Sequence, residues 1–169
     1  GCGPIGLMAV AAAKFKGASK IIAIDVVDSK LEMAKKMGAD VVINSKQQND
    51  LEIVLKETNG SGADAVIDYT GNNFAIRAGF KLVRKSGTVV LVGLTSGETP
   101  LDLANDIIYK EAAVYGVTGR LMYETWDECL EMLRSGFDLR PLMSGPYALK
   151  DFENAFEAVK TAVGRVVMI

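Results

Sequence analysis

Gly1-Cys2-Gly3-Pro4-Ile5-Gly6 is a GxGxxG pattern placed where a helix is expected to begin. In a dinucleotide-binding turn the first glycine allows the tight turn and the second lets the backbone approach a pyrophosphate. The third glycine lets helix and strand pack closely. The N-terminus of the helix then offers N–H groups and a positive dipole end to phosphates. Alone the pattern is weak, and no strand precedes it in the sequence, so a glycine-rich turn into an ordinary helix is the alternative.

Asp25 favours the cofactor interpretation. It ends the apolar run of residues 21–24 and follows Gly6 by 19 residues. An acidic residue at about that spacing accepts hydrogen bonds from the ribose hydroxyls of adenosine. The alternative is an aspartate that only begins the loop after a strand. NAD is favoured over NADP, because this carboxylate would face the 2′-phosphate and no arginine follows it. Lys30 is either a second ribose contact or a solvated charge at the start of a helix.

The rest of the chain alternates short apolar segments with segments of helical spacing, which indicates an α/β protein with a parallel sheet covered on both faces. The expected strands are residues 21–25, 41–44, 65–69, 88–92, 113–117 and 165–169. The expected helices run from Pro4 toward Gly17, from Ser29 to Gly38, and over residues 74–83, 123–133 and 150–159. Ser29 and Glu32 are interpreted as a capping box. Residues 137–146 are interpreted as irregular chain, and a domain boundary is placed near Gly136.

Composition excludes several classes of protein. With 169 residues, 49% of them hydrophobic and 24% charged, the chain has the size and composition of one globular core. A net charge of −2 gives no general attraction for nucleic acid or membrane lipid, and no apolar run has the length of a membrane span. Cys2 and Cys129 form no CxxC motif, so a cytoplasmic location without a disulfide framework or zinc site is expected. No histidine is present, which removes the commonest general base and metal ligand.

Three smaller features have two interpretations each. Cys2 is either a thiol activated by a helix N-terminus or a small residue that fills a tight loop, and the second is preferred. Met122, Tyr123 and Trp126 lie on an expected helix and are interpreted as core rather than as a cofactor stack. The acidic residues of the same helix are interpreted as a solvated face.

The sequence resembles the zinc-dependent medium-chain dehydrogenases/reductases over essentially its whole length. Residues 1–40 are similar to the opening of their coenzyme domain, and VVLVGL at 89–94 and GRVVMI at 164–169 are similar to later strands. The segment YGVTGRLMYETW at 115–126 is similar to the L-threonine 3-dehydrogenase branch, with sorbitol and other polyol dehydrogenases as the alternatives. The resemblance implies a Rossmann-type, doubly wound fold and a homo-oligomeric enzyme. It also implies oxidation of a small secondary alcohol, with hydride passed to NAD.

The resemblance assigns cofactor contacts residue by residue. The pyrophosphate turn would be formed by Gly1, Gly3, Pro4, Ile5 and Gly6. The adenosine end would be bound by Asp25 and Lys30 at the ribose and bordered by Thr70 at the adenine. The nicotinamide would be held by backbone around Val92, Gly93 and Leu94 and around Val117 and Thr118. Arg120 and Arg165 are further cofactor contacts, or surface ion pairs in the alternative.

The resemblance also implies what lies elsewhere. The family's zinc ligands and proton relay belong to a catalytic domain expected before Gly1, so zinc is expected in the parent enzyme and not on this chain, which would be inactive alone. Residues 1–136 would be the NAD-binding domain, and residues 137–169 would return to the catalytic domain. Met143-Ser144-Gly145 departs from the Thr-His that relatives carry after the proline that corresponds to Pro141.

The strand expected before Gly1 would lie at the centre of the sheet. Without it, the strands at 21–25 and 41–44 are expected to form one group, and the strands at 65–69, 88–92 and 113–117 another. The unpaired edges would invite another strand, for which residues 165–169 are one candidate.

Two other classes of function remain open at this point. A methyltransferase with a nucleoside cofactor also places a glycine-rich turn and an acid on a ribose, but it would add an antiparallel strand, and no hairpin signal follows Val117. A non-catalytic nucleotide-binding module is the third interpretation.

Overall fold

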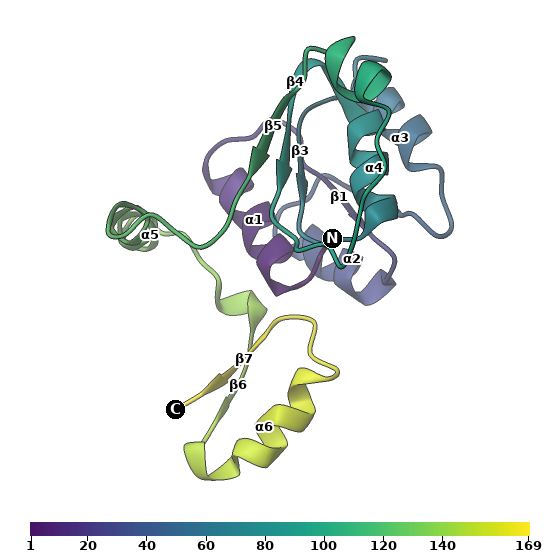
Figure 1. Ribbon diagram of the computed structural model, residues 1–169. Coiled ribbons are helices and arrows are strands. Elements are labelled where there is room, and N and C mark those ends of the chain that lie inside the picture. Colours follow the sequence, from purple (N-terminus) through teal and green to yellow (C-terminus); the bar gives the residue numbers. More distant parts are fainter. The chain divides into compact units, whose positions relative to one another are not determined.

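The computed structural model describes residues 1–169 and shows an α/β protein in which every strand pair is parallel (Figure 1). The strands form three separate sheets, with the orders β1-β2, β3-β4-β5 and β6-β7. The predicted division of the first five strands into a pair and a triplet is therefore confirmed. No helix combines the length and apolar character that crossing a membrane would require.

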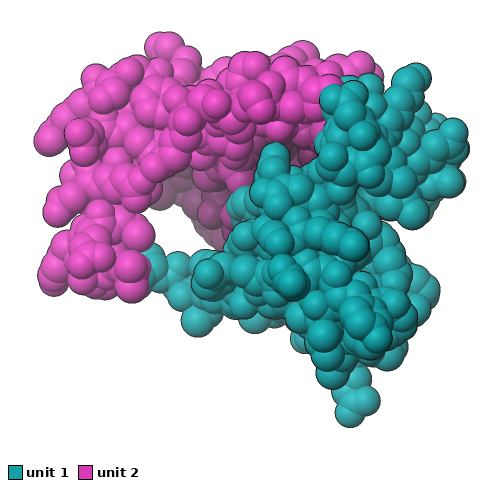
Figure 2. Space-filling view, turned by 90° about the horizontal axis from the view of Figure 1, so that it is seen from above, with its two compact units in different colours: residues 1, 45–120 teal, residues 2–44, 121–169 magenta.

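Contacts divide the chain into two compact units (Figure 2). Unit 1 contains Gly1 and residues 45–120, and unit 2 contains residues 2–44 and 121–169. Each unit has its own buried apolar cluster. The domain boundary near Gly136 stays a prediction.

Unit 2 begins with two helices and two strands, namely α1 (Pro4–Phe15), β1 (Ile22–Asp25), α2 (Asp28–Lys36) and β2 (Val41–Asn44). Proline suits the first position of α1, where no N–H is needed. The helix ends at Phe15, and the φ of 85° at Gly17, just beyond the C-cap residue, lets the Ala18 N–H bond to the carbonyl of Ala13. Leu7 of α1 and Ala34 of α2 are fully buried in the apolar cluster that these elements share.

The predicted capping box at the start of α2 is wrong. The N-cap residue is Val27, without a side-chain cap, and Ser29 lies inside the helix. The carboxylate of Asp25 instead accepts hydrogen bonds from the N–H groups of Val26 (2.7 Å) and Val27 (3.0 Å). The chain thus turns into α2 before Ser29 can act as a cap. The predicted end of α2 is confirmed, since Gly38 has a φ of 110°.

Unit 1 contains α3 (Asp50–Glu57), β3 (Ala63–Asp68), α4 (Asn73–Leu82), β4 (Val83–Leu91), a π-helical turn (Ala104–Ile108) and β5 (Ala113–Gly116). The three strands are in register at Val66, Val89 and Val114. Helix α4 packs on β3 and β4, and Phe80 of α4 and Val89 of β4 are buried in the unit's apolar cluster. Strand β4 begins earlier than predicted, directly after α4. The ladder tolerates this extension through an irregularity between Ala63 and Ala65.

The rest of unit 2 contains α5 (Glu124–Arg134), β6 (Met143–Tyr147), α6 (Phe152–Val159) and β7 (Arg165–Met168). The prediction of irregular chain was wrong at β6. Pro146 is tolerated there because the ladder with β7 is interrupted between Ser144 and Tyr147. Since β7 pairs with β6, residues 165–169, which were one candidate for the unpaired strand edges, do not join either of the other sheets.

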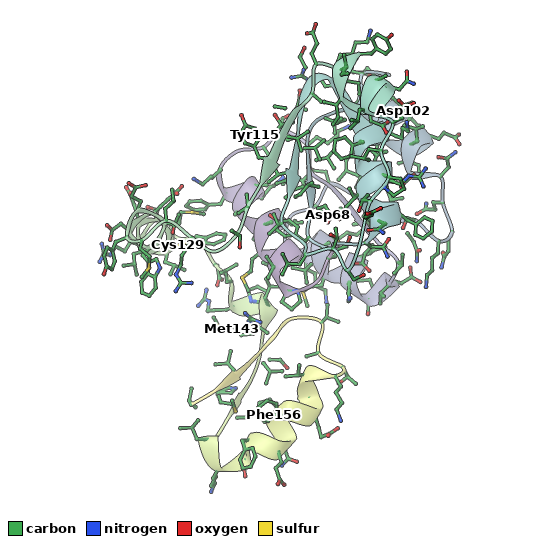
Figure 3. All side chains as sticks on the ribbon, viewed as in Figure 1. Asp68, Asp102, Tyr115, Cys129, Met143 and Phe156 are labelled. Atoms are coloured by element: carbon green, nitrogen blue, oxygen red, sulfur yellow. The ribbon has the colours of Figure 1, made fainter.

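Helix α5 confirms the helix predicted at 123–133, but no residue of it is buried. Trp126 is 50% exposed, and Met122 and Tyr123 are also exposed. The interpretation of these three residues as core was therefore wrong. Large apolar side chains are exposed on other elements as well, including Tyr115 on β5 and Phe156 on α6 (Figure 3).

Candidate cofactor-binding site

The N-terminus of α1 has the features that a pyrophosphate requires. Gly3 is the N-cap residue in extended backbone, and no side chain caps the helix. A Cβ built on Gly3 would meet no atom within 4 Å, so the backbone can be approached closely from that side. Pro4 has no N–H, and the next N–H groups belong to Ile5 and Gly6. The helix therefore presents backbone donors and its positive dipole end without a competing side chain.

Asp25 lies at the carboxyl end of β1 and binds the glycine-rich turn directly. The N–H of Cys2 donates to Asp25 Oδ2 at 2.6 Å, while Oδ1 accepts the N–H groups of Val26 and Val27. A carboxylate offers about four lone-pair sites, so these three bonds leave Oδ2 with capacity for one more donor. The structure thus joins two features that lie more than twenty residues apart in the sequence, and it leaves one acceptor position on Asp25 for a further donor such as a ribose hydroxyl.

Cys2 fills the interior of this turn. Its side chain is 2% exposed, and its Sγ lies 3.6 Å from the carbonyl oxygen of Ile24. Burial raises the pKa of the Cys2 thiol, and the nearby charge of Asp25 acts in the same direction, while Lys30 opposes it. A buried thiol whose pKa is raised is a poor nucleophile. The interpretation of Cys2 as a space-filling residue is confirmed.

In unit 1, the predicted site residues follow the carboxyl ends of three neighbouring parallel strands. Thr70 comes two residues after β3, residues 92–94 come directly after β4, and residues 117–120 come directly after β5. The N–H of Val117 extends the ladder by donating to the carbonyl of Leu91 at 2.9 Å. Ligands of open α/β sheets bind outside the carboxyl ends of the strands, so these loops occupy the expected edge.

Gly1 also belongs to unit 1 and lies against Thr70. A Cβ built on Gly1 would lie only 2.5 Å from the methyl carbon of Thr70. The first glycine of the motif is therefore required by close packing. Arg165, by contrast, lies on β7 in the separate β6-β7 sheet, where it pairs in register with Met143.

Asp68 is a residue of this region that the sequence analysis did not single out. It ends β3 and is 7% exposed. Its carboxylate accepts hydrogen bonds from the Thr70 hydroxyl (2.6 Å) and the Gly71 N–H (2.8 Å). Its carbonyl accepts from the N–H groups of Val92 (2.9 Å) and Gly93 (3.0 Å). The signal that could have found it is an acid at the end of an apolar strand, followed by Tyr-Thr-Gly-Asn.

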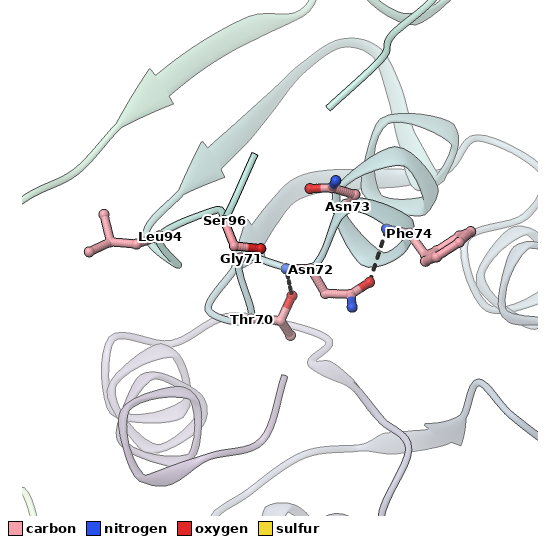
Figure 4. A pocket seen from close by; sticks show the side chains of 7 residues that line it. All are labelled: Thr70, Gly71, Asn72, Asn73, Phe74, Leu94 and Ser96. Carbon is pink, nitrogen blue, oxygen red and sulfur yellow. Dashed lines mark hydrogen bonds between the residues drawn. The ribbon is translucent and has the colours of Figure 1, made fainter. Parts of the chain in front are cut away.

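A shallow pocket of about 340 Å³ lies at the start of α4 (Figure 4). It is lined by Thr70, Gly71, Asn72, Asn73, Phe74, Leu94 and Ser96. Asn72 caps α4 by accepting from the N–H groups of Phe74 and Ala75. The lining contains no charged side chain. Two of its apolar side chains are largely exposed to solvent, Phe74 at 80% and Leu94 at 89%. This composition suits an uncharged, partly apolar group.

None of these candidate site residues belongs to a cluster that could bind a metal ion. No group of three or more histidine, cysteine, aspartate or glutamate side chains lies close enough together to hold a metal ion.

Comparison with known proteins identifies the family. The sequence profile described as zinc-binding dehydrogenase matches residues 4–135. This chain belongs to the zinc-binding dehydrogenase family. It is 42% identical to an L-threonine 3-dehydrogenase of Bacillus velezensis and 39% identical to one of Caldanaerobacter subterraneus, over 100% and 99% of its length. The chain spans about half the length of these curated relatives, 49% in each case.

Solved structures of dehydrogenases have the same fold. An alcohol dehydrogenase from Thermus sp. ATN1 superposes with a TM-score of 0.88 at 31% identity, covering 100% of this chain and 51% of that one. The benzyl alcohol dehydrogenase of Acinetobacter calcoaceticus gives a TM-score of 0.87 at 28% identity, covering 100% and 48%. The chain therefore matches the Rossmann-type coenzyme-binding half of the family. A methyltransferase-like arrangement is contradicted both by the family and by the absence of an antiparallel strand pair.

Proposed function

We propose that this chain is the NAD-binding part of an alcohol dehydrogenase that oxidises the secondary hydroxyl of L-threonine. The observation that carries the cofactor assignment is the hydrogen bond between Asp25 and the N–H of Cys2. It holds an acid with remaining acceptor capacity beside the uncapped N-terminus of α1, where a ribose and a pyrophosphate would be recognised together.

The proposal assigns each part of NAD to residues of the chain. The pyrophosphate would be bound at the turn of Gly1, Gly3, Pro4, Ile5 and Gly6, and the adenosine ribose by Asp25 and Lys30. Thr70 would border the adenine. Backbone of Val92, Gly93, Leu94, Val117 and Thr118 would hold the nicotinamide, with Arg120 and Arg165 as further contacts. When bound, the nicotinamide ring accepts the hydride that leaves the alcohol carbon. The chain's own task is binding and orientation, and no catalytic side chain is assigned to it.

Two curated relatives support L-threonine as the substrate, since both are named L-threonine 3-dehydrogenase. Sorbitol and other polyols are the alternative, favoured by a solved relative named 2R,3R-butanediol dehydrogenase, with a TM-score of 0.89 at 25% identity. We further propose, from the family resemblance, a homo-oligomeric cytoplasmic enzyme. Its zinc would be bound by residues outside this chain.

Titration of the chain with NADH, NADPH and S-adenosylmethionine tests the cofactor assignment. NADH should bind, NADPH should bind more weakly because Asp25 would face its 2′-phosphate, and S-adenosylmethionine should not bind. Equal affinity for the two dinucleotides, or preference for S-adenosylmethionine, would contradict the proposal. The substrate is tested separately on the full-length enzyme that contains this chain, by comparing NADH formation with L-threonine and with sorbitol.

A further inference from the structure

Two loops of unit 1 contact each other through their main chains. One joins β3 to α4 at residues 69–72, and the other follows β4 at residues 92–95. A Cβ built on Gly71 would lie 2.1 Å from the carbonyl oxygen of Leu94, and one built on Gly93 would lie 2.1 Å from the nitrogen of Gly71. Neither distance is possible for a real side chain. Gly71 also has a φ of 64°, which further favours glycine.

Asp68 connects the same two loops by hydrogen bonds. Its carbonyl holds the N–H groups of Val92 and Gly93, and its carboxylate holds the Thr70 hydroxyl and the Gly71 N–H. The carboxylate is buried, and a buried charge is costly unless every one of its bonds is kept. A single residue therefore fixes the turn after β3 and the turn after β4 at the same time.

The loop after β4 obtains little anchoring from its own side chains. Leu94 is 89% exposed, and Gly93 has no side chain. Its position depends on the bonds to Asp68 and on the contact with Gly71. A backbone that recognises a flat carboxamide-bearing ring by hydrogen bonds must be held accurately, because such bonds weaken steeply with distance and angle. A loop that is fixed beforehand also avoids the entropic cost of ordering on binding.

We propose that Asp68, Gly71 and Gly93 are positioning residues that set the main chain of residues 92–94 for the nicotinamide end of the cofactor. This rests on the proposed function, in which that main chain holds the nicotinamide. The adenosine and pyrophosphate contacts are assigned mainly to Asp25 and the glycine-rich turn. The three positioning residues therefore affect chiefly the binding of the nicotinamide end of the cofactor.

The test compares NADH with ADP-ribose, which lacks the nicotinamide, by calorimetric titration of the chain. Asp68→Asn keeps the size of the side chain but sets an amide against one of its two donors. Gly93→Ala introduces the excluded Cβ. Each variant should lose about tenfold in NADH affinity, equivalent to about 1.4 kcal/mol. Each should lose clearly less in ADP-ribose affinity, since at the adenosine end both variants disturb only Thr70, which would border the adenine. Gly97→Ala, shortly after this loop, is the matched control, since a Cβ there meets no atom within 4 Å, and neither affinity should change.

The outcomes separate this inference from the function on which it rests. If the unsubstituted chain binds neither ligand, the proposed function fails and the inference fails with it. If the unsubstituted chain binds both, but the variants keep the ratio of the two affinities, the positioning role is wrong and the proposed function stands. Thermal unfolding is recorded for every variant. If Gly93→Ala does not fold, the positioning role is tested by the ratio of the NADH and ADP-ribose affinities of Asp68→Asn.

Discussion

At the scale of single residues, Asp25 performs two tasks that substitution can separate. It holds the backbone of Cys2, Val26 and Val27, and it is proposed to bind the adenosine ribose. Hydrogen bonds to a charged group are worth about 1.5–3 kcal/mol, so Asp25→Ala should weaken NAD binding about ten- to a hundredfold. The difference in affinity between NAD and NADP should become smaller, because the carboxylate that would face the 2′-phosphate of NADP is gone.

Dissociation constants for NADH and NADPH, measured on Asp25→Ala and on Asp25→Asn, check this prediction. The asparagine retains an acceptor for backbone N–H groups but loses the charge. It should therefore keep more of the NADH affinity than alanine does and still relax the discrimination against NADPH. An unchanged ratio of the two affinities in both variants would mean that Asp25 is only a loop residue.

Asp138 gives a prediction about pH. Hydrogen bonds from the Arg140 side chain and backbone lower the pKa of Asp138 from 3.8 to about 2. A lowered pKa in the folded chain stabilises it above the ordinary pKa of the carboxyl, and this contribution is lost as the pH falls toward 2. The pair is exposed, so the effect is small. Urea unfolding of Asp138→Asn should show a deficit in stability relative to the parent at pH 6 that becomes smaller as the pH falls toward 2. A deficit as large at pH 2 as at pH 6 would require another cause.

At the scale of elements, the sequence was sufficient where one local signal dominated. Strand β2 was predicted at its observed bounds, because an apolar, β-branched run stands between polar residues. Strand β6 was missed because Gly145 and Pro146 argue against a strand, and only its pairing with β7 shows that the ladder is interrupted there. The start of α2 was misplaced because the helix begins one residue earlier, after the turn that Asp25 holds. The N–H of Leu31, which a Ser29 cap could have bound, already donates to the carbonyl of Val27.

In the candidate site, too, features with a local sequence signal could be predicted and features that depend on long-range contacts could not. The glycine-rich turn and Asp25 could be predicted, since their spacing along the chain reflects one strand and one helix. The role of Asp68 could not, because it depends on two loops more than twenty residues apart meeting at main-chain distance. No pattern in the sequence specifies that a carbonyl and a carboxylate of the same residue hold different loops.

Lys110 provides a prediction about helix α4. Its ammonium donates to the carbonyls of Phe80 (2.7 Å), Lys81 (3.1 Å) and Val83 (2.7 Å), at the end of the helix where carbonyls lack partners. Lys110→Met keeps the length of the side chain but removes these bonds. The substitution should lower the free energy of unfolding by about 1–2 kcal/mol. This is less than the usual contribution of hydrogen bonds from a charged group, because Lys110 is partly exposed to solvent. Lys56→Met on α3 is the control and should change stability little. Equal denaturation midpoints for both variants would contradict the capping role.

At the scale of the whole molecule, the two apolar clusters share no residue. One gathers around Leu7 and Ala34 in unit 2, and the other around Phe80 and Val89 in unit 1. The proposed cofactor contacts are divided in the same way, with Asp25 and most of the glycine-rich turn in one unit and residues 70 and 92–94 in the other. Each group of contacts is therefore supported by a different core.

This division predicts which part of the chain each core substitution weakens. Leu7→Ala should cost about 2–5 kcal/mol and Phe80→Ala about 3–5 kcal/mol, because both side chains are fully buried and each truncation leaves a cavity. Hydrogen exchange of backbone amides should show the loss of protection first in the unit that contains the substitution, since local openings draw on local packing. Leu7→Ala should accelerate exchange in α1 and α2, and Phe80→Ala in α4 and β4. If either substitution accelerates exchange equally in both units, the chain opens as one cooperative body, and the two groups of cofactor contacts would be lost together rather than one at a time.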